Sequence, residues 1–193
     1  MFLLRLKGET APQHVAIERQ IDLKRVCASR EAYAAHLARL YGFYLPLEDA
    51  LRRHVAAREA GVGERRRKTP LLACDLAVLG VDTARLPLCD ALPPLEKEEE
   101  AMGCLYVVEG ASLGGQIISR ILRQRLDIGP RNGAAFYNGY GDETPAMWEA
   151  FRSYLEAYAH DEARQEAVIG AARATFEALG AWLSRKELSS IDA

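Results

Sequence analysis

Apolar residues recur every three or four positions along most of the chain, the spacing that places them on one face of an α-helix. The two clearest stripes comprise Tyr33, Leu37, Tyr41 and Tyr44, and Val168, Ala172, Phe176, Leu179 and Leu183. No segment shows the sustained alternation of apolar and polar residues that is typical of a half-buried strand. We therefore predict an all-α fold, a single-domain multi-helix bundle spanning residues 1–193 with a core at about 3–185.

Residues that precede the apolar stripes indicate where helices begin. The side chains of Ser29 and Asp161 can accept hydrogen bonds from the free N–H groups of a first helical turn. Proline is favoured in that turn, so Thr69–Pro70 and Thr144–Pro145 each predict a helix start.

Two further prolines are interpreted in the same way. Pro12 is expected in the first turn of a helix capped by Thr10, and Pro46 is expected to open a helix through Leu51 and Val55. Both positions are tolerated because the first turn of a helix does not use the missing N–H of proline.

Three segments are interpreted as connections between helices. Residues 61–69 carry Arg-Arg-Arg-Lys, and a solvated basic loop is favoured over a phosphate-binding patch. Residues 81–93 contain turn-forming prolines, and residues 136–141 form a turn-rich aromatic loop.

The longest helical pattern runs from about residue 94 to residue 126 and contains Gly110, Gly114 and Gly115. Each glycine costs about 1 kcal/mol relative to alanine in a helix interior. Gly110 and Gly114 lie on one face, where a flat or bulky group can approach the backbone, and Gly114–Gly115 gives the helix a place to bend. Close packing of two helices across small residues explains the same spacing, and it is the commoner cause.

The composition is that of an ordinary globular protein, with 49% hydrophobic and 27% charged residues. A formal net charge of −2 argues against nonspecific nucleic-acid binding as the main task. The four cysteines (Cys27, Cys74, Cys89 and Cys104) lack C-x-x-C spacing, so buried reduced thiols are expected. The N-terminal apolar run is too short for a signal peptide, and Glu109 interrupts the central apolar run. We therefore expect a cytoplasmic protein with no membrane segment and no nucleic-acid partner.

The four histidines (His14, His36, His54 and His160) form no H-E-x-x-H motif and no other two-histidine metal spacing. A single histidine is nevertheless enough to bind haem iron, because the porphyrin supplies four nitrogens. Taken alone, each histidine is more often a surface or hydrogen-bonded core residue than a ligand. The residues by themselves therefore predict an open helix face but no reaction.

Three segments, in order along the chain, carry a resemblance to a known family. Leu105-Tyr-Val-Val-Glu-Gly-Ala-Ser-Leu-Gly-Gly-Gln116 resembles the distal-helix motif of haem oxygenases, especially the bacterial branch associated with bacteriophytochromes. Residues 136–151 resemble the loop and helix that follow in that branch. Residues 6–14 are similar to the first helix of the family, which carries the proximal histidine.

The resemblance implies a haem-oxygenase-like helical bundle that holds haem between a proximal helix and a kinked distal helix. It implies that His14 is the axial iron ligand. It also implies that Gly110, Gly114 and Gly115 lie over the opposite haem face, where they leave room for dioxygen and direct which meso carbon is attacked. Arg152 matches a residue that pairs with a haem propionate, and Lys7 is a candidate partner for the other propionate.

The implied reaction opens the haem ring with O2 to give biliverdin, carbon monoxide and ferrous iron. Haem is then both substrate and oxygen-activating cofactor. The electrons are expected from an external donor, a ferredoxin or a reductase, and a bilin-accepting bacteriophytochrome is a candidate partner.

The sequence departs from the family at several positions of the distal site. Ala111 stands where animal-type members have an aspartate that organises water near bound oxygen and where phytochrome-associated members commonly have serine. Ser112 points about 100° around the helix from Ala111 and is no automatic substitute. Val107 and Trp148 stand where animal-type members have an arginine and a second basic propionate partner. These departures leave the prediction of haem binding more secure than the prediction of efficient turnover.

Three alternatives remain open at this point. The loss of a polar side chain at position 111 motivates a haem-binding or haem-storage protein of the same fold with little turnover. A helical enzyme of thiamin salvage shares a similar architecture, but it would need a catalytic cysteine with paired carboxylates, and no cysteine here lies in such a motif. A purely structural interaction module would leave the three glycines unexplained.

Overall fold

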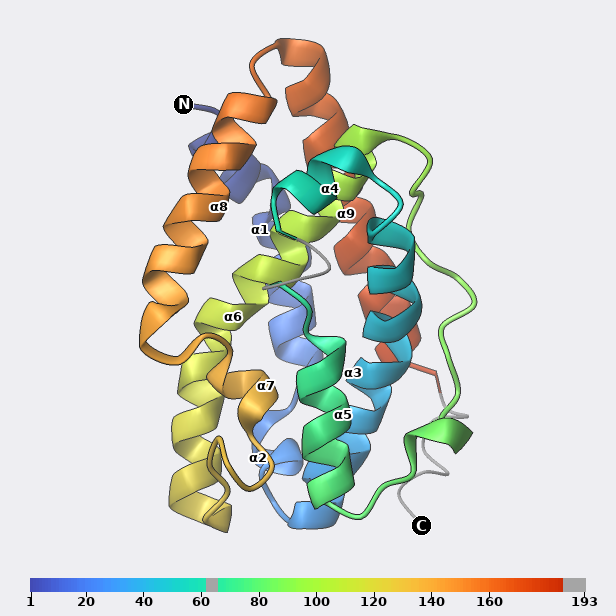
Figure 1. Cartoon of the computed structure of the whole chain (residues 1–193), viewed down its shortest axis with the longest axis vertical. Helices are drawn as coiled ribbons and strands as arrows, with labels where there is room; N and C mark the ends of the chain where they lie inside the picture. The colour runs from blue at the N-terminus through green and yellow to red at the C-terminus, as the bar shows by residue number, and fades with distance from the viewer. Residues whose placement is uncertain (62–65, 186–193) are drawn as a thin grey trace.

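The computed structural model describes residues 1–61 and 66–185, and within these residues it contains helices and no strand (Figure 1). The predicted all-α fold class is therefore confirmed. The α-helices are α1 (Phe2–Gln20), α2 (Leu23–Val26), α3 (Arg30–Leu51), α4 (Val55–Glu59), α5 (Thr69–Val78), α6 (Glu98–Leu126), α7 (Ala135–Asn138), α8 (Thr144–Tyr158) and α9 (Glu162–Leu183). Two single turns of 3₁₀-helix, η1 (Thr83–Arg85) and η2 (Gly141–Glu143), lie in the connections.

Helix α6 crosses the bundle diagonally in Figure 1 and packs most extensively against α9. Gly103 lies at the closest point, where a β-carbon would collide with the carbonyl oxygen of Val168 and the side chain of Ala171. Helix α1 packs on α9, and α3 packs on α5 and, less extensively, on α9. The core is therefore continuous around α6 and α9, and α6 is held firmly at its N-terminal half.

The predicted helix starts at Ser29, Asp161, Thr69 and Thr144 are confirmed. Ser29 Oγ accepts a hydrogen bond from the Ala32 N–H group at 3.1 Å, and the Asp161 carboxylate accepts one from Arg164 at 2.8 Å. These are the N-cap contacts that the sequence predicts.

The prediction that Pro46 opens a helix is wrong, because Pro46 lies inside the continuous helix α3. A proline in a helix interior leaves the carbonyl group four residues earlier without its donor. In α3 that carbonyl belongs to Gly42, and it accepts a hydrogen bond from the backbone N–H of Cys89 at 2.8 Å. The connection between α5 and α6 thus supplies the missing bond, and the helix continues.

The prediction for Thr10 and Pro12 is also wrong, because α1 begins at Phe2 and includes both residues. The side chains of Phe2 and Leu6 are buried, which stabilises helical turns well before Thr10. The Thr10 hydroxyl donates a hydrogen bond to the carbonyl of Leu6 at 2.8 Å instead of capping a helix.

Three smaller expectations also change. Helix α6 begins at Glu98, later than expected, because the Glu100 carboxylate accepts hydrogen bonds from Glu96 and Lys97 and fixes the start. Residues 136–141 contain most of the short helix α7 rather than only turns. Cys74 is exposed, whereas the other three cysteines are buried. By length and composition α6 is long and apolar enough to cross a membrane, but half of the relevant segment is buried in the bundle, as in a core helix.

Candidate functional site

Helices α1, α6 and α8 meet around Tyr106. Burial raises the pKa of the Tyr106 phenol, and the neighbouring Thr10 side chain of α1 and the charge of Arg152 of α8 oppose that rise. The ring of Trp148 of α8 lies 5.8 Å from the Tyr106 ring, centroid to centroid. Residues far apart in the sequence therefore converge here.

His14 and Gly110 lie one helical turn beyond this meeting point, His14 after Thr10 and Gly110 after Tyr106. Both α1 and α6 descend in Figure 1, and below their crossing α6 runs away from α1. His14 and Gly110 each follow, by one helical turn, a residue that takes part in the contact around Tyr106.

The His14 side chain is 57% exposed. Its ring packs edge-on against the ring of Phe176 in α9, with 5.7 Å between the two ring centroids. On its other side, Nδ1 lies 3.7 Å from the carboxylate of Glu18, one turn further along α1. That distance is too long for a hydrogen bond, but it places an acceptor beside Nδ1 and leaves Nε2 available to a metal.

The middle of α6 presents an open apolar face. A β-carbon at Gly114 would meet nothing within 4 Å, and one at Gly110 would meet only the Trp148 ring, at 3.7 Å. Leu113 is 41% exposed and Ile117 is 62% exposed beside them. Large exposed apolar side chains around an open backbone indicate a ligand-binding surface.

Gly115 differs from the other two glycines. It is buried, and a β-carbon there would come within 2.8 Å of the carbonyl oxygen of Tyr137 in α7. The expectation that all three glycines lie over one ligand face is therefore corrected: Gly110 and Gly114 face the open side, and Gly115 faces α7.

The two predicted propionate partners lie near the crossing of α1 and α6. Arg152 is half-buried, is close enough to act on the Tyr106 phenol, and forms an ion pair with Glu149 at 3.0 Å. Lys7 is exposed on α1, one turn before Thr10. Ala111 is exposed on the open side of α6, next to Gly110.

The basic loop expected to be solvated is largely buried at its described end, residues 66–69; residues 62–65 lie outside the described residues. The Arg66 and Lys68 side chains are only 6% and 3% exposed. Both pair with Glu109 of α6, which is 1% exposed, and Lys68 Nζ lies 3.2 Å from its Oε1. The Tyr140 hydroxyl donates to the same carboxylate at 2.9 Å.

Sequence reasoning missed this buried ion cluster, which we define as Arg66, Lys68, Glu109 and Tyr140. The signal available was Glu109 itself, a carboxylate in the middle of an apolar helical run. A buried carboxylate requires cations or several hydrogen-bond donors.

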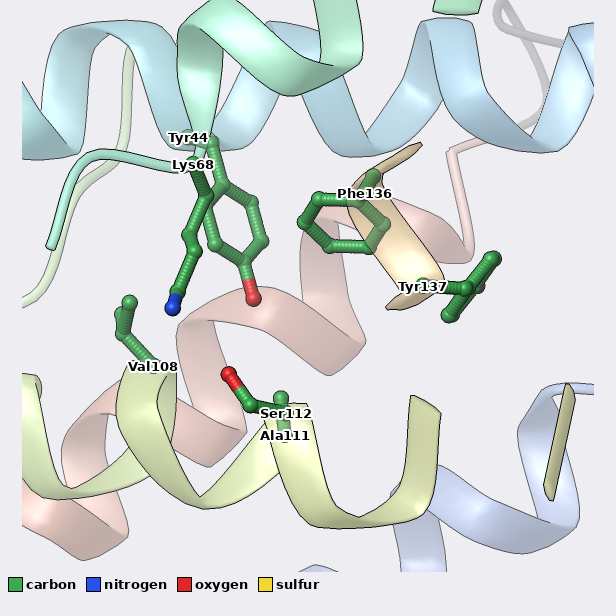
Figure 2. Close-up of a pocket in the computed structure, with 7 residues that line it drawn as sticks. All are labelled: Tyr44, Lys68, Val108, Ala111, Ser112, Phe136 and Tyr137. Carbon is green, nitrogen blue, oxygen red and sulfur yellow. The ribbon is translucent and has the colours of Figure 1, made fainter. Parts of the chain in front are cut away.

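A small pocket lies beside Lys68 of this cluster, between α3, α6 and α7, and Figure 2 shows its lining. Lys68 Nζ, the hydroxyl of Tyr44 and the hydroxyl of Ser112 point toward one another across it. The remaining lining residues are Val108, Ala111, Phe136 and Tyr137.

The residues on α1 and α6 supply the chemistry that haem requires. It is a flat and largely apolar ring with two carboxylates at one edge, and its iron takes a histidine ligand. Because Gly110 and Gly114 have no β-carbons, the space beside this face of α6 is open to a flat apolar group. His14 supplies an accessible imidazole on the facing helix, and Lys7 and Arg152 supply positive charge near the crossing.

Comparisons with known proteins identify the family. The family model described as heme oxygenase matches residues 1–185. A heme oxygenase of Xanthomonas campestris pv. campestris (strain 8004) is 35% identical over 147 residues, which cover 76% of this chain and 85% of that protein.

Solved structures share the fold. The NO- and CO-bound heme oxygenase of Neisseria meningitidis superposes with a TM-score of 0.83 at 24% identity, covering 98% of this chain and 92% of that chain. The heme oxygenase of Leptospira interrogans superposes with a TM-score of 0.77 at 17% identity, covering 95% of this chain and 98% of that chain.

Proposed function

Because the chain belongs to the haem oxygenase family, we propose that haem binds between α1 and α6, with His14 on one side of the ring and Gly110 and Gly114 on the other. The enzyme opens haem with O2 and external electrons to give biliverdin, carbon monoxide and ferrous iron. The observation that carries the proposed site is the open face of α6, one turn beyond its contact with α1 and beside exposed apolar residues.

Haem supplies the iron at which dioxygen is activated, and the protein supplies ligation, orientation and shielding. In this proposal the neutral His14 imidazole binds iron through Nε2. The carboxylate of Glu18 lies beside Nδ1 and orients the ring, as an outer carboxylate does for many metal-bound histidines. The Phe176 ring limits rotation of the imidazole from the other side.

Gly110 and Gly114 contribute to the proposed site because they have no side chains. Their open backbone would let the ring lie close to α6 and would leave space for a diatomic molecule. The exposed Leu113 side chain beside them would restrict how the ring can lie, and this steric restriction would set which meso carbon reacts. Gly115 contributes from the opposite face by letting α6 lie directly against α7.

Lys7 and Arg152 orient the ring through its propionates. A guanidinium group can hold a carboxylate through two parallel hydrogen bonds, so Arg152 fixes the ring more strongly than Lys7 does. Arg152 now pairs with Glu149 on the surface, and a propionate competes for the same donors.

Four further parts of the proposal concern the electron donor, the recipient of the product, the location of the enzyme and its domain organisation. We propose a ferredoxin or a reductase as electron donor, since no redox group other than haem is implied by the site. The likeness of residues 105–116 to the phytochrome-associated branch supports a bilin-accepting bacteriophytochrome as the product's recipient. We place the enzyme in the cytoplasm, and we propose that residues 1–193 form one domain.

Hemin titration of a matched pair of variants tests the site. Gly114→Leu would fill the open face, and Gly170→Leu adds the same side chain where a β-carbon also meets nothing within 4 Å, on α9. We expect Gly114→Leu to weaken hemin binding at least about tenfold, a change of about 1.4 kcal/mol, or to change the biliverdin isomer formed. Gly170→Leu should behave as wild type. Wild-type affinity and product in Gly114→Leu would remove α6 from the haem site.

A further inference from the structure

We propose that Arg173 and Gly180 of α9 are positioning residues for His14. They hold the segment of α1 that carries His14 at its two ends, and so they fix how the imidazole meets the haem iron. The inference rests on the proposed function, because His14 is the iron ligand only in that proposal. Both residues act through α1 and not on haem itself.

The second half of α1 has few contacts of its own to hold it in place. Pro12 has no N–H group, so the carbonyl of Gly8 receives no helical hydrogen bond from it, and α1 is weakened two residues before His14. Among residues 12–20, all of which the structure describes, Ile17 alone is buried. A helical segment that buries so little surface depends on contacts from outside for its orientation.

Arg173 holds this segment at its N-terminal end. Its Nε donates a hydrogen bond to the carbonyl of Glu9 at 2.9 Å, and its guanidinium also pairs with the Glu9 carboxylate at 2.7 Å. The same carboxylate accepts a hydrogen bond from Arg5 at 2.7 Å. One guanidinium thus holds both the backbone and the side chain of a residue three positions before Pro12, and such charge-assisted contacts fix direction as well as distance.

Gly180 holds the segment at its other end. A β-carbon on Gly180 would lie 3.3 Å from Ile17 Cδ1 and 3.3 Å from Gln20 Oε1, closer than ordinary van der Waals contact. The Gln20 amide donates hydrogen bonds to the Gly180 carbonyl at 2.8 Å and to the Ser184 hydroxyl at 2.7 Å. Because Gly180 has no side chain, α1 lies directly on α9 one turn beyond His14.

The two contacts lie on one face of α9, on either side of the residue that touches His14. Arg173, Phe176 and Gly180 are three and four positions apart, the spacing of one helix face. Phe176 packs against the ring of His14, so the three residues meet α1 in the order in which they follow along α9. Helix α9 is itself packed extensively on α6. It therefore forms a rigid support that sets the height and the tilt of the α1 segment.

An iron ligand needs such support. A side chain that binds a metal has to be held within about 0.5 Å and 10–20° of its working geometry by the residues around it. Loss of an outer partner typically lowers metal affinity about 10–100-fold. Glu18 beside Nδ1 orients the His14 ring, whereas Arg173 and Gly180 place the backbone from which the ring projects.

Arg173→Gln tests the N-terminal contact, and Arg164→Gln is its control. Arg164 also lies on α9, is similarly exposed and pairs with the carboxylates of Glu99 and Asp161. In the haem-free protein, Arg173→Gln should speed hydrogen exchange of the backbone amides of residues 12–20, measured by mass spectrometry. In the hemin complex it should weaken hemin binding about tenfold and shift or broaden the iron–histidine stretching band of the reduced complex in resonance Raman spectra. Arg164→Gln should leave all three unchanged.

Gly180→Ala separates positioning from stability. Its methyl group displaces Ile17 and Gln20 by a few tenths of an ångström, and alanine favours a helix interior more than glycine does. We therefore expect the iron–histidine band to shift while the urea midpoint does not fall. Gly170→Ala is the control, because a β-carbon at Gly170 meets nothing within 4 Å.

The outcomes for α9 and for haem binding can be told apart. Wild-type hydrogen exchange in Arg173→Gln overturns the proposal, and so does a wild-type iron–histidine band in Arg173→Gln or in Gly180→Ala. If Arg173→Gln does not fold, Gly180→Ala decides. A wild-type protein that binds no hemin, or whose complex has no iron–histidine band, would instead contradict the proposed function, and hydrogen exchange would still decide whether α9 holds the segment.

Discussion

The carbonyl oxygen of Tyr137 lies so close to Gly115 that a β-carbon on Gly115 would be only 2.8 Å from it. The contact brings the backbone of α7 directly against the glycine segment of α6. The next residue, Gln116, strengthens it by donating a hydrogen bond to the Asn138 carbonyl at 3.0 Å. Two neighbouring glycines thus serve opposite faces of one helix, since Gly114 borders open space and Gly115 borders α7.

Alanine substitutions should separate these two roles. Gly115→Ala would force a methyl group into the backbone of α7, and overpacking of this kind costs about 1–3 kcal/mol of unfolding free energy. Gly114→Ala meets nothing and should stabilise the protein by up to about 1 kcal/mol, because alanine favours a helix interior more than glycine does. Urea unfolding of the two haem-free variants measures both changes, and equal changes would refute the assignment of the two faces.

Replacing His14 should remove the axial imidazole. We expect His14→Ala to lose the Soret and charge-transfer features of histidine-ligated ferric haem, and added imidazole should restore them, because the space left by the side chain remains accessible. His160→Ala is the matched control, since His160 is also exposed. An unchanged spectrum in His14→Ala would mean that another residue binds the iron.

Much of the fold was predictable from local sequence signals, and the exceptions have tertiary causes. Ser29 and Asp161 were identifiable because an N-cap contact is made within four residues. Pro46 was misread because the donor that rescues its helix, the N–H of Cys89, lies 43 positions further along the chain. Local patterns cannot reveal such a contact.

The candidate site, like the fold, was predictable only where its features depend on local sequence. The open face at Gly110 and Gly114 could be inferred from helical geometry, whereas the opposite orientation of Gly115 depends on α7. Burial of Lys68 was missed because charged loops are usually solvated, and its partner Glu109 lies far away in the sequence. The roles given to Lys7, His14, Ala111 and Arg152 remain predictions.

Removing Glu109 should destabilise the protein strongly. Glu109→Ala leaves the buried charges of Arg66 and Lys68 without their carboxylate, and loss of one partner from a buried ion pair costs about 3–5 kcal/mol. Asp49→Ala removes an exposed carboxylate that pairs with Arg52, and this change should cost less than about 1 kcal/mol. Denaturant unfolding compares the two variants. A small effect of Glu109→Ala would mean that the cluster is hydrated.

His36 should make the stability of the protein sensitive to mildly acidic pH. Burial, with a smaller contribution from Arg39, lowers the pKa of His36 to about 4, and its Nε2 lies 2.5 Å from the Tyr137 hydroxyl. An unfolded histidine binds its proton near pH 6.5, so between pH 6.5 and 4 the unfolded chain binds more protons than the folded one. This group therefore removes up to about 3 kcal/mol of stability as the pH falls through that window, and nothing further below it.

A comparison with His36→Gln isolates that contribution. Glutamine can hydrogen-bond to Tyr137 but does not titrate, so the variant should lose less stability than wild type between pH 6.5 and 4. Urea unfolding at several pH values measures the difference. Parallel pH profiles would show that His36 is protonated without penalty in the folded protein.

The most direct test of the central claim is an absorption time course of the purified protein reconstituted with hemin and then given a reductant and oxygen. Our account predicts that the Soret band decays while a broad red biliverdin band grows, with release of carbon monoxide. A stable Soret band that only shifts on reduction would contradict ring opening and would identify a haem-binding protein, with Ala111 the first residue to examine. Failure to form a Soret band with hemin would contradict the site itself.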